Sequence, residues 1–333
     1  MTSVDIAAGL TDAFGRRIRY LRLSVTDRCN LRCRYCMGGD VTFLPKREIL
    51  TLEEMLRVSE VFVRLGVVKV RVTGGEPLAR PGVVGLIERL GALLDGGGLE
   101  ELTLTTNGIL LARHASALQA AGVRRVNVSL DTLDASRFQA ITGHDGLAQV
   151  LAGIEAVRAL GIAVRLNTVV QGGVNDDELD RLVAWSGGHG CDMALIECMP
   201  MKGAAAGPAL LLDAVRDRLA ERWTLQPLSE RSTGPADYCR VVETGQRLGF
   251  IAPMSHGFCP RCNRVRLTCS GRLVLCLGQD HGVDLRPALR EQTSDAALED
   301  AIRAAIASKP LRHHFAASGQ TAETAAPMWQ MGG

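Results

Sequence analysis

The sequence lacks three features that would direct it to a membrane, an export route or a nucleic acid. No stretch of about 18 apolar residues predicts a membrane-spanning helix. The first ten residues contain no basic start followed by an apolar run, so we expect no signal peptide and a cytoplasmic location. The formal net charge of the 333 residues is only +2, which argues against a broad basic field for nucleic acid.

Lysine is also scarce, because only four of the 38 basic residues are lysines: Lys46, Lys69, Lys202 and Lys309. Arginine therefore carries nearly all of the positive charge, and its planar fork suits phosphate groups. Genomic codon bias accounts for the total, since alanine and glycine are abundant as well. Particular arginine positions, rather than the number of arginines, therefore carry the functional argument.

Ten cysteines stand out against these absences, and six of them lie in two tight sets. In a chain without an export signal, this pattern favours metal binding over disulfides. The first set, Cys29, Cys33 and Cys36, has C-x₃-C-x₂-C spacing. A structural zinc loop usually brings two cysteines from each of two hairpins, which this triplet fits poorly. Three thiolates can instead hold three corners of an iron–sulfur cube and leave one iron open.

Six strand-like segments alternate with helical segments in the first two thirds of the chain. The strands are expected at 18–26, 69–74, 102–107, 125–131, 164–170 and 193–199, and helices at 51–66, 81–94, 111–121, 147–160 and 176–186. A capping box, Thr51-Leu-Glu-Glu54, opens the first helix. The alternation implies parallel strands with right-handed crossovers. Six units are too few for a closed eight-stranded barrel, so we predict an incomplete (β/α)₆ TIM-like barrel of α/β class.

The predicted strands alternate polar and apolar residues, whereas parallel strands covered on both faces are usually apolar throughout. In the second strand, Val70 and Val72 oppose Arg71. The sixth strand is weaker, with Glu197 and Met199 on one face and Ile196 on the other. If helices cover the apolar face, the lumen receives Arg22, Arg71, Thr105, Ser129 and Arg165. Buried unpaired charge is costly, so this lumen must hold water or a polar, anionic ligand.

The last third of the chain is predicted to be a separate α+β extension that covers the open side of the barrel. We place the barrel at residues 1–225 and the extension at 226–333, because turn-forming residues accumulate after residue 226. The extension carries the second cysteine set, Cys259, Cys262 and Cys276, in C-x₂-C-x₁₃-C spacing. Arg264 and Arg266 are two residues apart, so in a strand they point the same way and suit a polyphosphate.

These motifs resemble a known family. The first cysteine set resembles the signature of the radical S-adenosylmethionine (SAM) enzymes. Thr73-Gly74-Gly75-Glu76-Pro77 is similar to their second motif, whose backbone and glutamate receive the methionine end of SAM. With the second cysteine set and the terminal Gly332-Gly333, the chain resembles the GTP 3′,8-cyclases of molybdenum cofactor biosynthesis, from about Phe14 to its last residue.

The resemblance implies an activity, two cofactors and several partners. Two [4Fe–4S] clusters and SAM would act on GTP as substrate, in a lyase reaction. A 5′-deoxyadenosyl radical would take a hydrogen atom from C3′ of the ribose. The C3′ radical would then attack C8 of guanine, and one-electron reduction and protonation of the cyclised radical would give (8S)-3′,8-cyclo-7,8-dihydroguanosine 5′-triphosphate. The resemblance implies two protein partners: an electron donor such as flavodoxin or ferredoxin, and a downstream cyclic pyranopterin monophosphate synthase. It implies no nucleic acid or membrane partner, and it leaves a homodimer open.

Motif matches also imply residue roles. Cys29, Cys33 and Cys36 would hold the first cluster, and Cys259, Cys262 and Cys276 the second. SAM contacts would come from Tyr35, Gly75, Ser129 and Met199. GTP contacts would come from Arg22, Arg71, Thr105, Arg165, Arg264, Val265 and Arg266. The catalytic set would be the first three cysteines with Arg264 and Arg266, and the Gly-Gly tail would enter the active site.

Two other functions compete with this interpretation. A peptide-modifying radical SAM maturase would usually carry more C-terminal cysteines in other spacings, and the Arg264/Arg266 pair would meet no anion. A zinc-stabilised binding module without catalysis would be colourless and would leave the polar lumen unexplained. Among the spare cysteines, Cys269 could supply a fourth ligand to the second cluster, but we predict that it does not and that all of them pack as small hydrophobic residues.

Overall fold

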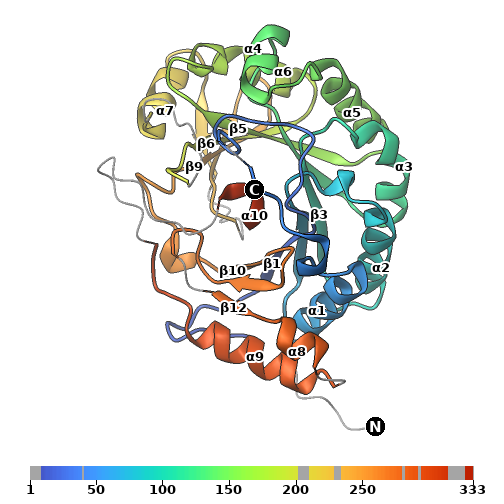
Figure 1. The fold of residues 1–333 in the computed structure, drawn as a ribbon. Coiled ribbons are helices and arrows are strands. Elements are labelled where there is room, and N and C mark those ends of the chain that lie inside the picture. Colours follow the sequence, from blue (N-terminus) through green and yellow to red (C-terminus); the bar gives the residue numbers. More distant parts are fainter. Residues whose placement is uncertain are drawn as a thin grey trace.

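The computed structural model describes residues 9–39, 41–201, 210–228, 234–279, 282–291, 294–313 and 327–332. Six parallel strands form the centre of the fold and pair in chain order. They are β1 (Tyr20–Ser24), β2 (Lys69–Thr73), β3 (Glu101–Thr106), β4 (Arg125–Ser129), β5 (Ala163–Val170) and β6 (Asp192–Glu197). Each lies within two residues of its predicted segment at both ends. The predicted partial barrel is therefore confirmed, and Figure 1 looks into its lumen.

Helices cover the outside of these strands (Figure 1). They are α1 (Leu52–Arg64), α2 (Val83–Asp95), α3 (Leu111–Ala120), α4 (Ala135–Thr142), α5 (Leu147–Ala159), α6 (Leu179–Gly188) and α7 (Leu212–Ala220). The capping box is confirmed, because the Thr51 hydroxyl accepts from the Glu54 amide at 3.1 Å and the Glu54 carboxylate accepts from the Thr51 amide at 2.7 Å. Helix α4 was not predicted, since its eight residues show too little periodicity.

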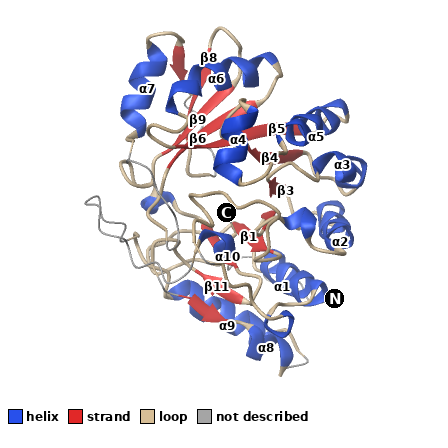
Figure 2. Cartoon of the chain, turned by 45° about the horizontal axis from the view of Figure 1, so that its top comes forward, coloured by secondary structure: helices blue, strands red, loops and turns tan. Residues whose placement is uncertain are grey.

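The C-terminal part of the chain continues the same sheet from both edges. Strand β10 (Arg264–Leu267) pairs in parallel with β1, and β9 (Arg247–Ile251) pairs in parallel with β6. The sheet order is β12-β11-β10-β1-β2-β3-β4-β5-β6-β9-β8-β7. The remaining elements are β7 (Leu225–Pro227), β8 (Asp237–Val241), β11 (Arg272–Val274), β12 (Gly282–Asp284), α8 (Arg286–Arg290), α9 (Ala296–Ala307) and α10 (Met328–Met331). The extension thus lengthens the barrel wall besides covering its open side, as Figure 2 also shows.

The alternation of the strands decides what the lumen contains. Val70 and Val72 are buried in the core between strands and helices, whereas Arg71 between them lines the lumen. Helix α10 lies at the centre of the barrel in Figure 1, so the chain end occupies the lumen that the polar faces surround. The sixth strand differs from its prediction, because Ile196 lines the lumen as well as Glu197. Among the described residues, none of the helices is both long and apolar enough to span a membrane.

Candidate active site

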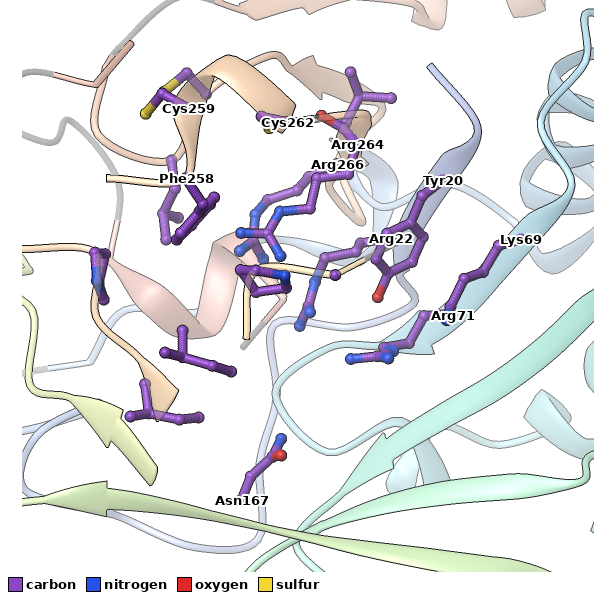
Figure 3. Close-up of a pocket in the computed structure, with 18 of the residues that line it drawn as sticks. Tyr20, Arg22, Lys69, Arg71, Asn167, Phe258, Cys259, Cys262, Arg264 and Arg266 are labelled. Carbon is purple, nitrogen blue, oxygen red and sulfur yellow. Dashed lines mark hydrogen bonds between the residues drawn. The ribbon is translucent and has the colours of Figure 1, made fainter. Parts of the chain in front are cut away.

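The lumen contains a cavity of about 400 Å³ whose wall is rich in arginine. Arg22 of β1 stands beside Arg71 of β2 and Arg266 of β10, because the parallel register pairs these positions directly. Figure 3 shows the three side chains projecting into the same space. Arg264 and Arg165 line the cavity too. The structure therefore brings together five of the arginines that the sequence placed at a nucleotide site.

Burial makes this arginine group a strongly anion-seeking one. The pKa of Arg71 falls to about 9, first because of burial and then because Arg165 and Arg22 are close. Burial also lowers the pKa of Arg22 and of Arg266, whose like-charged neighbours add to the effect. Like charges held together out of water gain most from an anion that binds between them. The cavity is therefore suited to a ligand with several negative charges, such as a polyphosphate.

Two further residues line the cavity at the starts of β1 and β2, and the sequence argument did not single them out as site residues. Tyr20 and Lys69 pair across β1 and β2, two residues before Arg22 and Arg71 on their strands, and both line the cavity. The Tyr20 ring lies 5.2 Å from Lys69 Nζ and 5.4 Å from Arg71 Cζ. Burial alone would raise the pKa of the Tyr20 phenol, but the surrounding cations lower it to about 7. Period-two spacing from the predicted arginines could have identified both positions.

The second cysteine set lines one end of this cavity, with Arg264 and Arg266 between its members. Cys259 and Cys262 lie next to Phe258 in Figure 3, across the cavity from Arg71, and Cys276 lines the same cavity. Burial would raise the pKa of the Cys262 thiol, but the Arg264 guanidinium and other cations lower it. Burial raises the pKa of Cys276, and the other two thiols of the set add to that shift. The thiols of Cys259 and Cys262 are therefore close enough to Cys276 for their charges to affect its pKa.

The first cysteine set lines a second cavity, of about 190 Å³, together with Gly74 and Gly75. The glycines are required there by close backbone approach. A Cβ at Gly75 would lie 2.3 Å from the Arg28 carbonyl oxygen, and one at Gly74 would lie 2.8 Å from that of Thr26. The Gly75 amide donates to the Thr26 carbonyl at 2.7 Å, which fastens the turn after β2 to the cysteine loop.

Each cysteine set consists of the residue type that holds iron–sulfur clusters. Burial raises the pKa of Cys29, Cys33 and Cys36, and that of Cys36 reaches about 12, so these thiols ionise only beside a strong positive charge. Among the described residues, no three His, Cys, Asp or Glu side chains are close enough to share one metal ion. Because iron–sulfur clusters are held by Cys thiolates, each set could supply three of the four ligands that such a cluster takes.

The predicted SAM residues Tyr35, Ser129 and Met199 line the second cavity, and so does Thr105, which was predicted for GTP. The Tyr35 hydroxyl donates to Asp131 Oδ2 at 2.8 Å, and burial raises the pKa of Asp131 to about 6. Met199 lines both cavities, as do Asn167 and Ile196. The two cavities therefore adjoin, and the two cysteine sets stand at different ends of one chamber.

Glu76 does not line either cavity, although the motif predicted that its carboxylate would receive the ligand. Its Oε1 accepts from the Leu78 amide at 3.0 Å and the Thr106 hydroxyl at 2.8 Å, and Oε2 accepts from the Asn107 amide at 2.7 Å. The carboxylate thus joins the turn after β2 to the end of β3. Burial raises the pKa of Glu76 to about 7. Of this motif, only the residues up to Gly75 line the cavity.

The chain end enters the chamber, as the sequence predicted for the Gly-Gly tail. The Gly332 carbonyl accepts from Arg266 Nη1 at 2.7 Å and from Arg22 Nη2 at 3.0 Å. Met328, at the start of α10, lines both cavities. Gly333 lies outside the described residues. Cys269 is fully buried near Asp27 and Arg80 and does not line the cavity of the second cysteine set.

Comparison with known proteins agrees with this geometry. Residues 23–186 match the family model described as the radical SAM superfamily, and residues 191–315 match that described as Molybdenum Cofactor Synthesis C. The chain is 54% identical over 319 residues to a protein of Paracoccus denitrificans named GTP 3′,8-cyclase, covering 95% of this chain and 92% of that protein. The chain belongs to the GTP 3′,8-cyclase family.

A second relative and a solved structure agree with this assignment to the GTP 3′,8-cyclase family. A protein of the same name from Bradyrhizobium diazoefficiens is 52% identical over 313 residues, or 93% of this chain and 91% of the relative. Among solved structures, Streptococcus suis SuiB bound to S-adenosylmethionine aligns with a TM-score of 0.63 at 15% identity, over 86% of this chain and 68% of SuiB. At that identity the likeness concerns the fold, and it agrees with the partial TIM-like barrel.

Proposed function

We propose that this protein cyclises GTP by radical SAM chemistry to (8S)-3′,8-cyclo-7,8-dihydroguanosine 5′-triphosphate, an early step of molybdenum cofactor biosynthesis. One observation carries the proposal: two three-cysteine sets stand at different ends of one chamber, and buried arginines line the space between them. A carbon radical needs an enclosed chamber, because side reactions would otherwise quench it, and an anionic substrate needs the arginines that line this one. The relatives' name agrees with this reading.

The second cavity, which the first cysteine set lines, would bind the radical-generating cofactors. Cys29, Cys33 and Cys36 would hold a [4Fe–4S] cluster, and SAM would lie against Gly75 and Met199 in the same cavity. When bound, this pair supplies a 5′-deoxyadenosyl radical that removes hydrogen from C3′ of the GTP ribose. The protein's part is to hold that ribose within reach and to exclude water. Tyr35, fixed by its hydrogen bond to Asp131, would support the cofactor side of the chamber.

The arginine-lined cavity would bind GTP. Arg22, Arg71 and Arg165 would hold the triphosphate, and the support for this is that each is buried and lines the cavity. Arg264 and Arg266, with the Val265 backbone between them, lie between that region and the second cysteine set. Cys259, Cys262 and Cys276 would hold a second [4Fe–4S] cluster with an open iron beside the guanine. The protein would thereby fix the base and the ribose in the orientation that cyclisation requires.

The proposal extends to residue boundaries and partners. The radical SAM barrel would comprise residues 1–225 and the extension 226–333. A low-potential carrier such as flavodoxin or ferredoxin would deliver electrons, and a cyclic pyranopterin monophosphate synthase would take the product. These partners follow from the proposed reaction, which consumes one electron for SAM cleavage and one for reduction of the cyclised radical, and yields a product that still needs rearrangement.

Anaerobic reconstitution with iron, sulfide, SAM, dithionite and GTP tests the proposal. We expect 5′-deoxyadenosine to form only when GTP is present, and deuterium at C3′ of labelled GTP to appear in the 5′-deoxyadenosine. Arg71→Met should raise the KM for GTP far more than it lowers SAM cleavage at saturating GTP. A peptide-modifying enzyme would form no deuterated 5′-deoxyadenosine from GTP, and that result would refute the assignment.

A further inference from the structure

Behind the second cysteine set lies a group of buried cations that the proposed reaction does not use. Arg16 comes from the N-terminal segment and is only 9% exposed. Its Nη1 donates to the Cys259 carbonyl at 2.8 Å and to the Leu311 carbonyl at 2.8 Å, and its Nη2 donates to the Pro310 carbonyl at 2.6 Å. Asp12 Oδ2 compensates the Arg16 charge at 2.5 Å. Arg16 therefore clamps the first cysteine of the set to the segment that follows α9.

Lys309 opens that clamped segment and is buried to 2% exposure. Its Nζ donates to the carbonyl oxygen of Leu275, the residue before Cys276. Among the described residues, Lys309 has no carboxylate partner. An ammonium has three donors, and one neutral carbonyl neither uses them all nor balances a buried positive charge. A burial of this kind needs an anion nearby.

The second cysteine set would supply negative charge beside Lys309 once it holds a cluster. Lys309 Nζ donates to the carbonyl oxygen of Leu275, which directly precedes Cys276. A cluster held by three thiolates is negatively charged overall, and its reduction potential depends on nearby charge and hydrogen bonds. Lys309 thus lies where it would act on both the loop and the cluster.

We propose that Lys309 is a positioning residue of the second iron–sulfur site, where its buried ammonium offsets the charge of a cluster on Cys259, Cys262 and Cys276 and fixes the Cys276 loop. Arg16 supports this arrangement by holding residues 310 and 311, which follow Lys309, against Cys259. This inference rests on the proposed second cluster, but it concerns a residue outside the ligand set. It predicts that removing the charge makes the cluster harder to reduce.

The test uses full-length protein in which Cys29, Cys33 and Cys36 are serine, so that only the second set can load. Lys309→Met removes the charge at similar length, Lys309→Arg retains it, and Lys46→Met is a control at an exposed lysine. Iron and sulfide per chain, the EPR signal and a redox titration are measured after anaerobic reconstitution. For Lys309→Met we expect the ratio of reduced to oxidised cluster at a fixed potential to fall roughly tenfold or more, or the cluster to be lost.

The other variants separate charge from structure. Lys309→Arg should stay close to the parent protein, and Lys46→Met should match it. The inference is overturned if Lys309→Met loads a cluster with unchanged potential, or if Lys309→Arg shifts the potential as far as Lys309→Met does. Loss of the cluster in Lys309→Met with rescue in Lys309→Arg supports it. A parent protein that binds no second cluster would instead refute that part of the proposed function.

Discussion

The position of Gly332 between Arg22 and Arg266 offers the most direct test of the active-site geometry. Gly332 has φ +74°, a left-handed conformation that favours glycine. A Cβ at this position would lie 2.3 Å from Thr73 Oγ1 and 3.0 Å from Ser24 Cβ. Ser24 and Thr73 are paired neighbours on β1 and β2, so the barrel wall cannot give way easily. Gly332→Ala should therefore lift the tail from its seat.

The cost can be worked out from the contacts that the tail makes. The left-handed conformation alone costs an alanine about 1–2 kcal/mol. The Gly332 carbonyl accepts from Arg22 and Arg266, and a hydrogen bond to a charged group contributes about 1.5–3 kcal/mol. Losing one of these bonds and the orientation of its arginine should lower kcat/KM for GTP by about 10- to 100-fold.

The assay is anaerobic formation of cyclised product and 5′-deoxyadenosine at several GTP concentrations. Gly161→Ala is a matched control, because Gly161 has φ +75° but a Cβ there would meet nothing within 4 Å. Gly161→Ala should keep full activity, whereas deletion of residues 332 and 333 should behave like Gly332→Ala. Wild-type kcat/KM in Gly332→Ala would refute the reasoning, and so would loss of iron from that variant, since the tail contacts arginines rather than cluster ligands.

Three further predictions address other parts of the protein. The pKa of Tyr20 is lowered to about 7, and a bound anion disfavours its phenolate, so GTP binding should be coupled to uptake of a proton. The Kd for GTP should therefore rise by up to about tenfold per pH unit above pH 7. Calorimetric titrations should show this rise in the parent protein and a flatter pH profile in Tyr20→Phe. Cys269→Ser should retain the iron and sulfide content of both clusters in chemical analysis; loss of the second cluster would make Cys269 a ligand. Gly91→Ala should lower stability by about 1–3 kcal/mol in thermal unfolding, because its Cβ would lie 2.2 Å from the Ala121 carbonyl, while Gly85→Ala on the same helix meets nothing within 4 Å and should be neutral or stabilising.

The outcome for the strands explains how much of the site was predictable. Arg22 and Arg71 could be assigned to the lumen because strand side chains alternate with a strict period of two. Thr105, Ser129 and Arg165 followed by the same rule, and all five line the chamber. Ile196 was misassigned, since the sixth strand has no clear alternation to read. Helix α4 was missed because eight residues carry little periodic signal.

Other features depended on contacts between segments far apart in the chain. Glu76 belongs to a motif that predicted a ligand-binding carboxylate, yet backbone amides after β2 and β3 and the Thr106 hydroxyl use up its oxygens. Lys309 has no recognisable motif, and only its placement behind Cys276 gives it a role. No local pattern predicts such contacts, because they depend on how loops meet after the barrel has formed.

The sequence by itself determined the cysteine spacing, the order of strands and helices, and the polar face of each strand. These properties follow from local geometry, since side-chain direction repeats every two residues in a strand and about every 3.6 in a helix. Only the tertiary structure decided that β9 and β10 extend the sheet from opposite edges, that the two cysteine sets share one chamber, and that Gly332 lies between Arg22 and Arg266. Those arrangements arise from pairing between residues that are 55 to 244 positions apart, where the burial of the whole sheet, rather than any local preference, selects the partner.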